Sequence, residues 1–172
     1  MQWNWSELAN VNLHPVQIAL IAAALVGACF TDLRMRRIPN YITVPAMLAG
    51  LAVNAFLDWP GGVLVALAGW ALGIALYLIP FFLGYGAGDL KLVAALGAIG
   101  GPAFVIWCVA FTLIAGFVSA IVTLVRERQL GTVAGGIALD VVTRQKIQAS
   151  SGIRQPHAIS IAIGAAAAIL LR

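Results

Sequence analysis

Residues 16–37 read VQIALIAAALVGACFTDLRMRR, an apolar run that ends in an aspartate and three arginines. Hydrophobic residues make up 62% of the 172-residue chain and charged residues only 9%, against about 25% charged in an average soluble domain. A membrane-spanning helix needs about 20 apolar residues, and only helices or closed barrels satisfy every backbone group in lipid. The long apolar runs lack two-residue alternation, which excludes a barrel. The sequence therefore predicts an all-α, polytopic membrane protein.

Charged residues, glycines and prolines divide the chain into about six predicted transmembrane helices, which we expect to form a single transmembrane domain over residues 1–172. The predicted spans are roughly 15–31, 42–57, 62–83, 90–101, 103–125 and 157–171. The fourth is short and ends at Gly100, Gly101 and Pro102. Glycine tolerates positive φ and proline cannot continue a helix, so we expect spans four and five to form a helical hairpin.

The basic residues predict the orientation of the spans. Three arginines follow the first span, and five further basic residues lie between the last two, Arg126, Arg128, Arg144, Lys146 and Arg154. The positive-inside rule then assigns loops 32–41, 84–89 and 126–156 to the cytoplasm and both termini to the outside. Four tryptophans fall at or near the predicted outer interface, Trp3, Trp5, Trp59 and Trp107. We interpret the net charge of +4 as a result of the basic loops that orient the protein in the membrane. We therefore expect membrane lipid, and no nucleic acid, as a partner.

Asp32 and Asp89 are candidate catalytic residues, because each lies where a predicted span meets a polar stretch and an even number of spans separates them. They should face the same side of the membrane, and an acid held close to hydrocarbon is a functional candidate. Two carboxylates within a few ångströms cannot both ionise easily, so one keeps a proton while the other is ionised. Aspartyl hydrolysis needs one carboxyl group in each of these two states. The alternatives are that Asp89 is a helix N-cap and that Asp32 is a solvated acid neutralised by the arginines.

The residues beside the two aspartates allow several interpretations. Gly86 and Gly88 permit backbone conformations and close approaches that a Cβ would forbid, or they form an ordinary loop. Lys91 either snorkels to the interface or acts electrostatically on a nearby carboxylate or on a substrate. Pro39 interrupts the chain before span two.

Neither the histidines nor the cysteines suggest a metal or organic cofactor. His14 and His157 fall on opposite predicted faces of the membrane, and Cys29 and Cys108 fall at different predicted depths. We therefore expect no disulfide, no metal site and no cofactor.

Three motifs in this order resemble those of the type IV prepilin peptidases, aspartic proteases of the bacterial inner membrane with a GxGD motif. They are Asp32 followed by Arg37-Ile38-Pro39-Asn40, then Gly86-Ala87-Gly88-Asp89-Leu90-Lys91, and finally Pro156-His157-Ala158-Ile159 with Gly164. The resemblance implies that Asp32 and Asp89 are the catalytic pair at the cytoplasmic face. It implies loop-shaping or substrate-contacting roles for Gly86, Gly88, Lys91, Arg37, Pro39 and Asn40.

The resemblance also implies the substrate, a prepilin or pseudopilin precursor. Such precursors carry a short basic leader that is cut after a glycine, ahead of an apolar helix. Longer family members have two CxxC pairs associated with N-methylation, and this sequence of two cysteines has neither pair. It therefore resembles the short, peptidase-only members of Flp-type tight-adherence pilus systems, and no methyltransferase activity is expected.

Two other classes of function remain open from the residues themselves. A small proton-coupled transporter would use Asp89 and Lys91 as a relay. A non-enzymatic pilus-assembly protein of the membrane would not need either aspartate.

Overall fold

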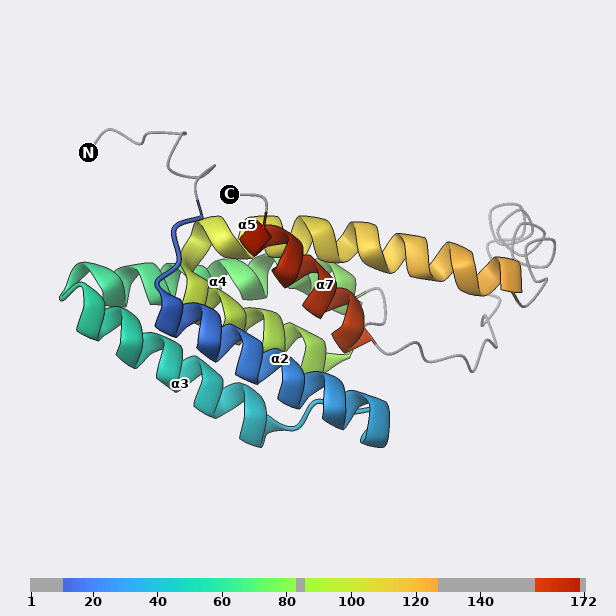
Figure 1. Ribbon diagram of the computed structural model, residues 1–172, viewed down its shortest axis with the longest axis horizontal. Coiled ribbons are helices and arrows are strands. Elements are labelled where there is room, and N and C mark those ends of the chain that lie inside the picture. The colour runs from blue at the N-terminus through green and yellow to red at the C-terminus, as the bar shows by residue number, and fades with distance from the viewer. Residues whose placement is uncertain (1–10, 83–85, 127–156, 171–172) are drawn as a thin grey trace.

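The computed structural model describes residues 11–82, 86–126 and 157–170. Within these ranges the chain forms α2 (Pro15–Met35), α3 (Asn40–Leu57), α4 (Gly61–Phe82), α5 (Ala87–Arg126) and α7 (His157–Leu170), with no strand (Figure 1). The predictions for Trp3, Trp5, residues 84–85 and the loop at 127–156 concern residues outside this description.

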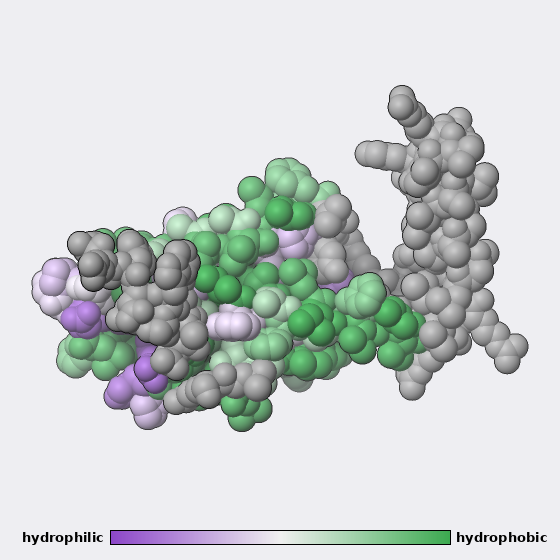
Figure 2. Space-filling view, turned by 90° about the horizontal axis from the view of Figure 1, so that it is seen from above, coloured by the Kyte–Doolittle hydropathy of each residue, from purple (hydrophilic) through white to green (hydrophobic). Residues whose placement is uncertain are grey.

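The helices have the length and composition of membrane spans. Helices α2, α3 and α4 and the Ala87–Ser119 part of α5 are long and apolar enough to cross a membrane, and α7 is a shorter apolar helix. Large apolar side chains point outward, with Phe56 94% and Phe82 78% exposed. Figure 2 shows apolar residues over most of the described surface visible in that view. The predicted class, an all-α polytopic membrane protein, is confirmed.

Helix α5 turns back on itself at Gly101, which has φ 77° and ψ −178°. Figure 1 shows its two halves running in opposite directions. A Cβ added to Gly97 would lie 3.3 Å from the side chain of Val105, although eight residues of straight helix span about 12 Å. The predicted hairpin between the segments 90–101 and 103–125 is therefore confirmed.

The first half of α5 is the central helix of the bundle. Its residues 92–99 are all buried, and it packs very closely on α4. A Cβ on Gly69 of α4 would collide with the carbonyl of Gly97, and a Cβ on Gly97 would collide with the carbonyl of Gly69. Small residues that let two helix backbones approach are typical of membrane bundles. This contact holds in place the half-helix that begins at Ala87 and carries Asp89 in its first turn.

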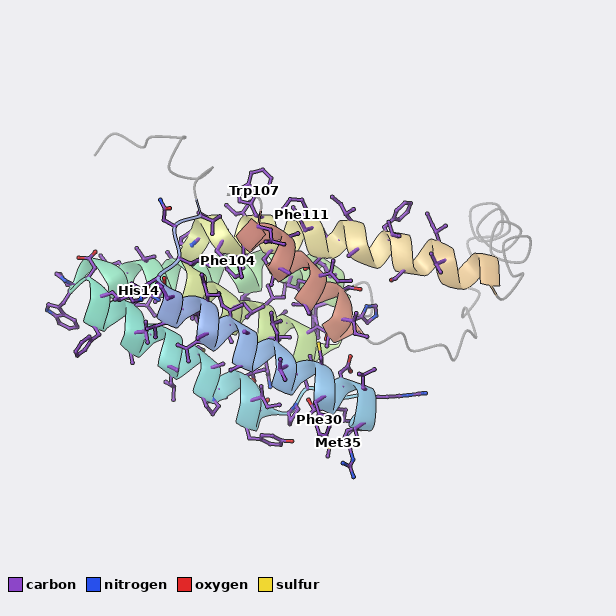
Figure 3. All side chains as sticks on the ribbon, viewed as in Figure 1. His14, Phe30, Met35, Phe104, Trp107 and Phe111 are labelled. Atoms are coloured by element: carbon purple, nitrogen blue, oxygen red, sulfur yellow. The ribbon has the colours of Figure 1, made fainter. Side chains whose placement is uncertain are left out.

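The two ends of the bundle are built from different residues. His14 and Trp107 lie toward the end where α5 turns, whereas Phe30 and Met35 lie where α2 finishes (Figure 3). Trp59 belongs to the α3–α4 connector at the turn end. The two tryptophans therefore share the end that was predicted to face outward.

Three helices meet in a buried polar network next to the turn. Proline has no N–H to donate to the carbonyl four residues before it, and Pro102 thus leaves the Ala98 carbonyl without its helical partner. Asn54 Nδ2 of α3 donates to the carbonyl oxygens of Ala98 at 3.1 Å and Ile99 at 2.9 Å. Gln17 Nε2 of α2 donates to the Ile99 oxygen at 2.9 Å and to Asn54 Oδ1 at 3.0 Å. Side chains from α2 and α3 therefore satisfy the carbonyls at the break in α5.

Replacing Asn54 with leucine should destabilise the protein, because it removes the amide that donates to the Ala98 and Ile99 carbonyls. We expect the Asn54→Leu variant to lose about 1–3 kcal/mol in free energy of unfolding, the typical cost of an unpaired buried polar group. Denaturant unfolding in detergent micelles, followed by circular dichroism, measures this loss.

Thr43 of the same helix provides a matched control. Its buried Oγ1 has no hydrogen-bond partner within the described part of the chain. Thr43→Val should therefore leave the free energy of unfolding unchanged or raise it. Equal losses in the Asn54 and Thr43 variants would show that the network is not specifically stabilising.

Candidate functional site

The two predicted catalytic residues lie at the same end of the bundle, away from the turn in α5. Asp32 is half-buried in the last turn of α2, and Asp89 is in the first turn of α5 with 7% of its surface exposed. Asp89 interacts electrostatically with Asp32 and with His157, the first residue of α7. The structure thus places two carboxylates that are far apart in sequence at the same end of the bundle.

Asp32 is held by the beginning of α7. The backbone N–H of Ala158 donates to Asp32 Oδ2 at 3.2 Å. The first N–H groups of a helix have no partner within the helix, and that end of the helix dipole favours negative charge. The Arg36 N–H also donates to the backbone oxygen of Asp32 at 2.8 Å, and Arg36 ends α2 in the left-handed conformation, with φ 51° and ψ 34°. Both the carboxylate and the backbone of Asp32 are therefore fixed.

Asp89 lies inside the first turn of α5 and not at the N-cap position, since the helix begins at Ala87. Its own N–H donates to the Gly86 carbonyl oxygen at 3.1 Å. Asp89 is buried, with 7% of its surface exposed. The N-cap alternative for Asp89 therefore does not describe this structure.

Gly88 allows the first turn of α5 to contact the connector between α2 and α3. A Cβ on Gly88 would lie 3.1 Å from both the Cβ and the backbone oxygen of Ile38, which is 8% exposed. At Gly86 a Cβ would lie 3.4 Å from Asp89 Oδ2, an ordinary contact distance. The two glycines of the motif thus differ, because only Gly88 is in tight contact with another segment.

The remaining predicted residues surround this end of the bundle. Lys91 Nζ donates to Asn40 Oδ1 at 2.9 Å on the surface. Pro39 is the N-cap of α3, with extended backbone at φ −79° and ψ 153°, and Arg37 is exposed. Lys91 and Asn40 are thus brought into direct contact, while Arg37 lies on the surface of the same connector.

The beginning of α7 contributes more to the site than the sequence predicted. The sequence indicated no site role for His157 or Cys29, yet His157 interacts electrostatically with Asp89, and Cys29 Sγ donates to the Ala158 carbonyl oxygen at 3.5 Å. The contact between Asp32 and the start of α7 could have been predicted from the span map, because the last predicted span starts on the same side of the membrane as Asp32. The free N–H groups at the start of that span favour a nearby carboxylate. Among the described residues, no three His, Cys, Asp or Glu side chains are grouped as metal ligands.

Comparisons with known proteins agree with this description. Residues 19–124 match the type IV leader peptidase family. A prepilin leader peptidase/N-methyltransferase of Neisseria gonorrhoeae is 31% identical over 127 residues, which cover 70% of this chain and 42% of the relative. A prepilin leader peptidase/N-methyltransferase of Aeromonas hydrophila is 32% identical over 145 residues, which cover 73% of this chain and 50% of the relative. The chain thus spans about half the length of these relatives. No solved structure gave a significant match.

The fold and the paired carboxylates define a helical membrane protein with an acidic site at one end of its bundle. Because the matched residues make up more than half of the chain, the chain belongs to the type IV leader peptidase family. The match includes both Asp32 and Asp89, and the resemblance found in the sequence motifs is confirmed.

The difference between the two glycines can be tested directly. Gly88→Ala should lower the free energy of unfolding by about 1–3 kcal/mol, the usual cost of overpacking, because the new methyl group presses on the Ile38 backbone. Gly86→Ala is the control and should have a smaller effect, since its methyl group would make only ordinary van der Waals contacts, the nearest at 3.4 Å from Asp89 Oδ2. Denaturant unfolding measures both, and a greater loss in the Gly86 variant would contradict the proposed difference.

Proposed function

We propose that this protein is a membrane aspartyl endopeptidase that removes the leader from prepilin precursors, with Asp32 and Asp89 as its catalytic pair. The observation that carries the proposal is the placement of these two carboxylates at the same end of an apolar helical bundle, Asp32 in the last turn of α2 and the buried Asp89 in the first turn of α5. Membership of the type IV leader peptidase family and the printed names of the relatives support it.

The reaction needs one ionised and one protonated carboxyl group. The ionised group accepts a proton from a water molecule while the water oxygen bonds to the carbonyl carbon of the scissile peptide. The protonated group donates a hydrogen bond to the carbonyl oxygen and stabilises the tetrahedral intermediate. The C–N bond then breaks, and the leaving amine takes a proton from the pair. The peptide is hydrolysed without any other reactant.

The position of the site suits a precursor that is part polar and part apolar. The pair lies at the end of the helices, where an exposed polar connector meets the lipid-facing sides of the bundle. A short basic leader would remain in water while the apolar helix behind it lies in lipid. By the positive-inside rule, this end with Arg34, Arg36 and Arg37 faces the cytoplasm of the inner membrane. We propose a small precursor of the Flp type, following the resemblance of the sequence motifs to the short, peptidase-only members of the family.

Replacing either aspartate with asparagine should abolish cleavage. Asparagine has the same shape but neither accepts a proton from water nor donates one as an acid, and acid–base groups contribute about 10²–10⁴-fold to such reactions. We expect Asp32→Asn and Asp89→Asn each to slow cleavage by at least about 10²-fold. The assay is co-expression with a small prepilin, with the ratio of precursor to mature protein read by mass spectrometry.

Asp58→Asn is the matched control, because Asp58 is an exposed acid that follows α3 at the other end of the bundle. This variant should cleave at the rate of the unmodified protein. Membrane fractionation checks that all variants insert equally. Rapid cleavage by the Asp32→Asn/Asp89→Asn double variant would rule out the proposed mechanism.

A further inference from the structure

The connector between α2 and α3 contacts the first turns of α5 at two places, one on each side of Asp89 in sequence. Ile38 packs closely against the backbone at Gly88, where an added Cβ would lie 3.1 Å from both the Cβ and the backbone oxygen of Ile38. Two residues further along, Asn40 Oδ1 accepts a hydrogen bond from Lys91 Nζ at 2.9 Å. We call these four residues, Ile38, Asn40, Gly88 and Lys91, the connector clamp.

Lys91 is not placed to act as the counter-ion of Asp89. Residues two apart on a helix point to different sides, and here Asp89 is buried while Lys91 is exposed. The ammonium group of Lys91 contacts the Asn40 side chain instead. The contact that Lys91 makes is thus between two segments of the chain.

The connector between α2 and α3 is short and its conformation is restricted. A displacement at one end of the connector therefore also moves the other end. Asp32 lies six residues before Ile38 in the sequence, and the Arg36 N–H bond to the Asp32 oxygen fixes the end of α2. Pro39 restricts the backbone just before α3. Movement of the first turn of α5 away from the connector therefore requires the clamp contacts to open.

We infer that Asn40 and Lys91 are positioning residues, whose hydrogen bond holds the first turn of α5 so that Asp89 faces Asp32. The inference rests on the proposed peptidase function. Neither residue touches the reacting atoms in this role. Misplacement of a catalytic group by about 1 Å can cost about 10²-fold in rate, so even a partial opening of the clamp slows catalysis.

A double-mutant cycle tests the inference, with Asn40→Leu, Lys91→Met and the double variant reconstituted in liposomes. The probe is a purified small prepilin with a basic leader. Each single variant should lower kcat about tenfold with KM changed less than twofold, and the double variant should be no slower than the singles, because residues that share one contact are not additive. Lys91→Arg and Asn40→Asp keep a donor facing an acceptor, and each should retain most of the kcat.

Arg34→Gln is the matched control for the loss of positive charge at this end of the bundle. Arg34 is exposed in the last turn of α2, and its replacement leaves the clamp intact, so kcat should be unchanged. If the losses of kcat multiply in the double variant, or if the single variants change KM and not kcat, then Lys91 binds substrate or lipid. Either result would overturn the inference.

Hydrogen exchange gives a second readout that does not depend on cleavage. Amide exchange over residues 86–92 should rise severalfold in both Asn40→Leu and Lys91→Met, whereas exchange near the turn at residues 98–105 should stay the same. Unchanged exchange at 86–92, or faster exchange with unchanged kcat, overturns the positioning role. Failure of the unmodified protein to cleave the prepilin would instead refute the proposed function, and the exchange data would then decide the clamp contacts alone.

Discussion

A carbonyl group that loses its helical partner inside a bilayer has no water to replace it, and the architecture of this protein depends on meeting that constraint at one turn. Helix α5 breaks at Gly101 and Pro102 in the apolar part of the chain. Asn54 and Gln17 supply the missing donors from two other helices. Side chains of α2 and α3 thus satisfy the carbonyls at the reversal of α5, which ties the hairpin to the helices that lead to and from Asp32.

The features of the fold that could be predicted from the sequence, including the reversal of α5, are those that depend on local residues. Span positions follow from apolar length, and the turn follows from the backbone preferences of glycine and proline at residues 100–102, both of which are local properties. The placement of Asp32 and Asp89 at one end needed only a count of the spans between them. Local composition and span parity together therefore predicted the class of fold, the hairpin and the location of the two acids at the same end of the bundle.

The contacts that refine the site could not be predicted in the same way. Asn54 and Gln17 are 37 residues apart in sequence, and nothing in the local pattern indicates that their amides meet at the same carbonyl. Lys91 was interpreted from its nearness in sequence to Asp89, but helical geometry directs it to Asn40, 51 residues away. His157 is even further from Asp89 in the chain. Such pairings depend on the rotation of each helix about its axis, which packing determines.

The bond between the Ala158 N–H and Asp32 joins residues 126 positions apart, and this separation has a consequence for biogenesis. The ribosome makes Asp32 early and α7 late, so the carboxylate enters the membrane well before the helix that holds it. A nascent chain that has inserted α2 to α5 has both acids but lacks the donor that orients one of them. Completion of the site is therefore delayed until the rest of the bundle has been inserted.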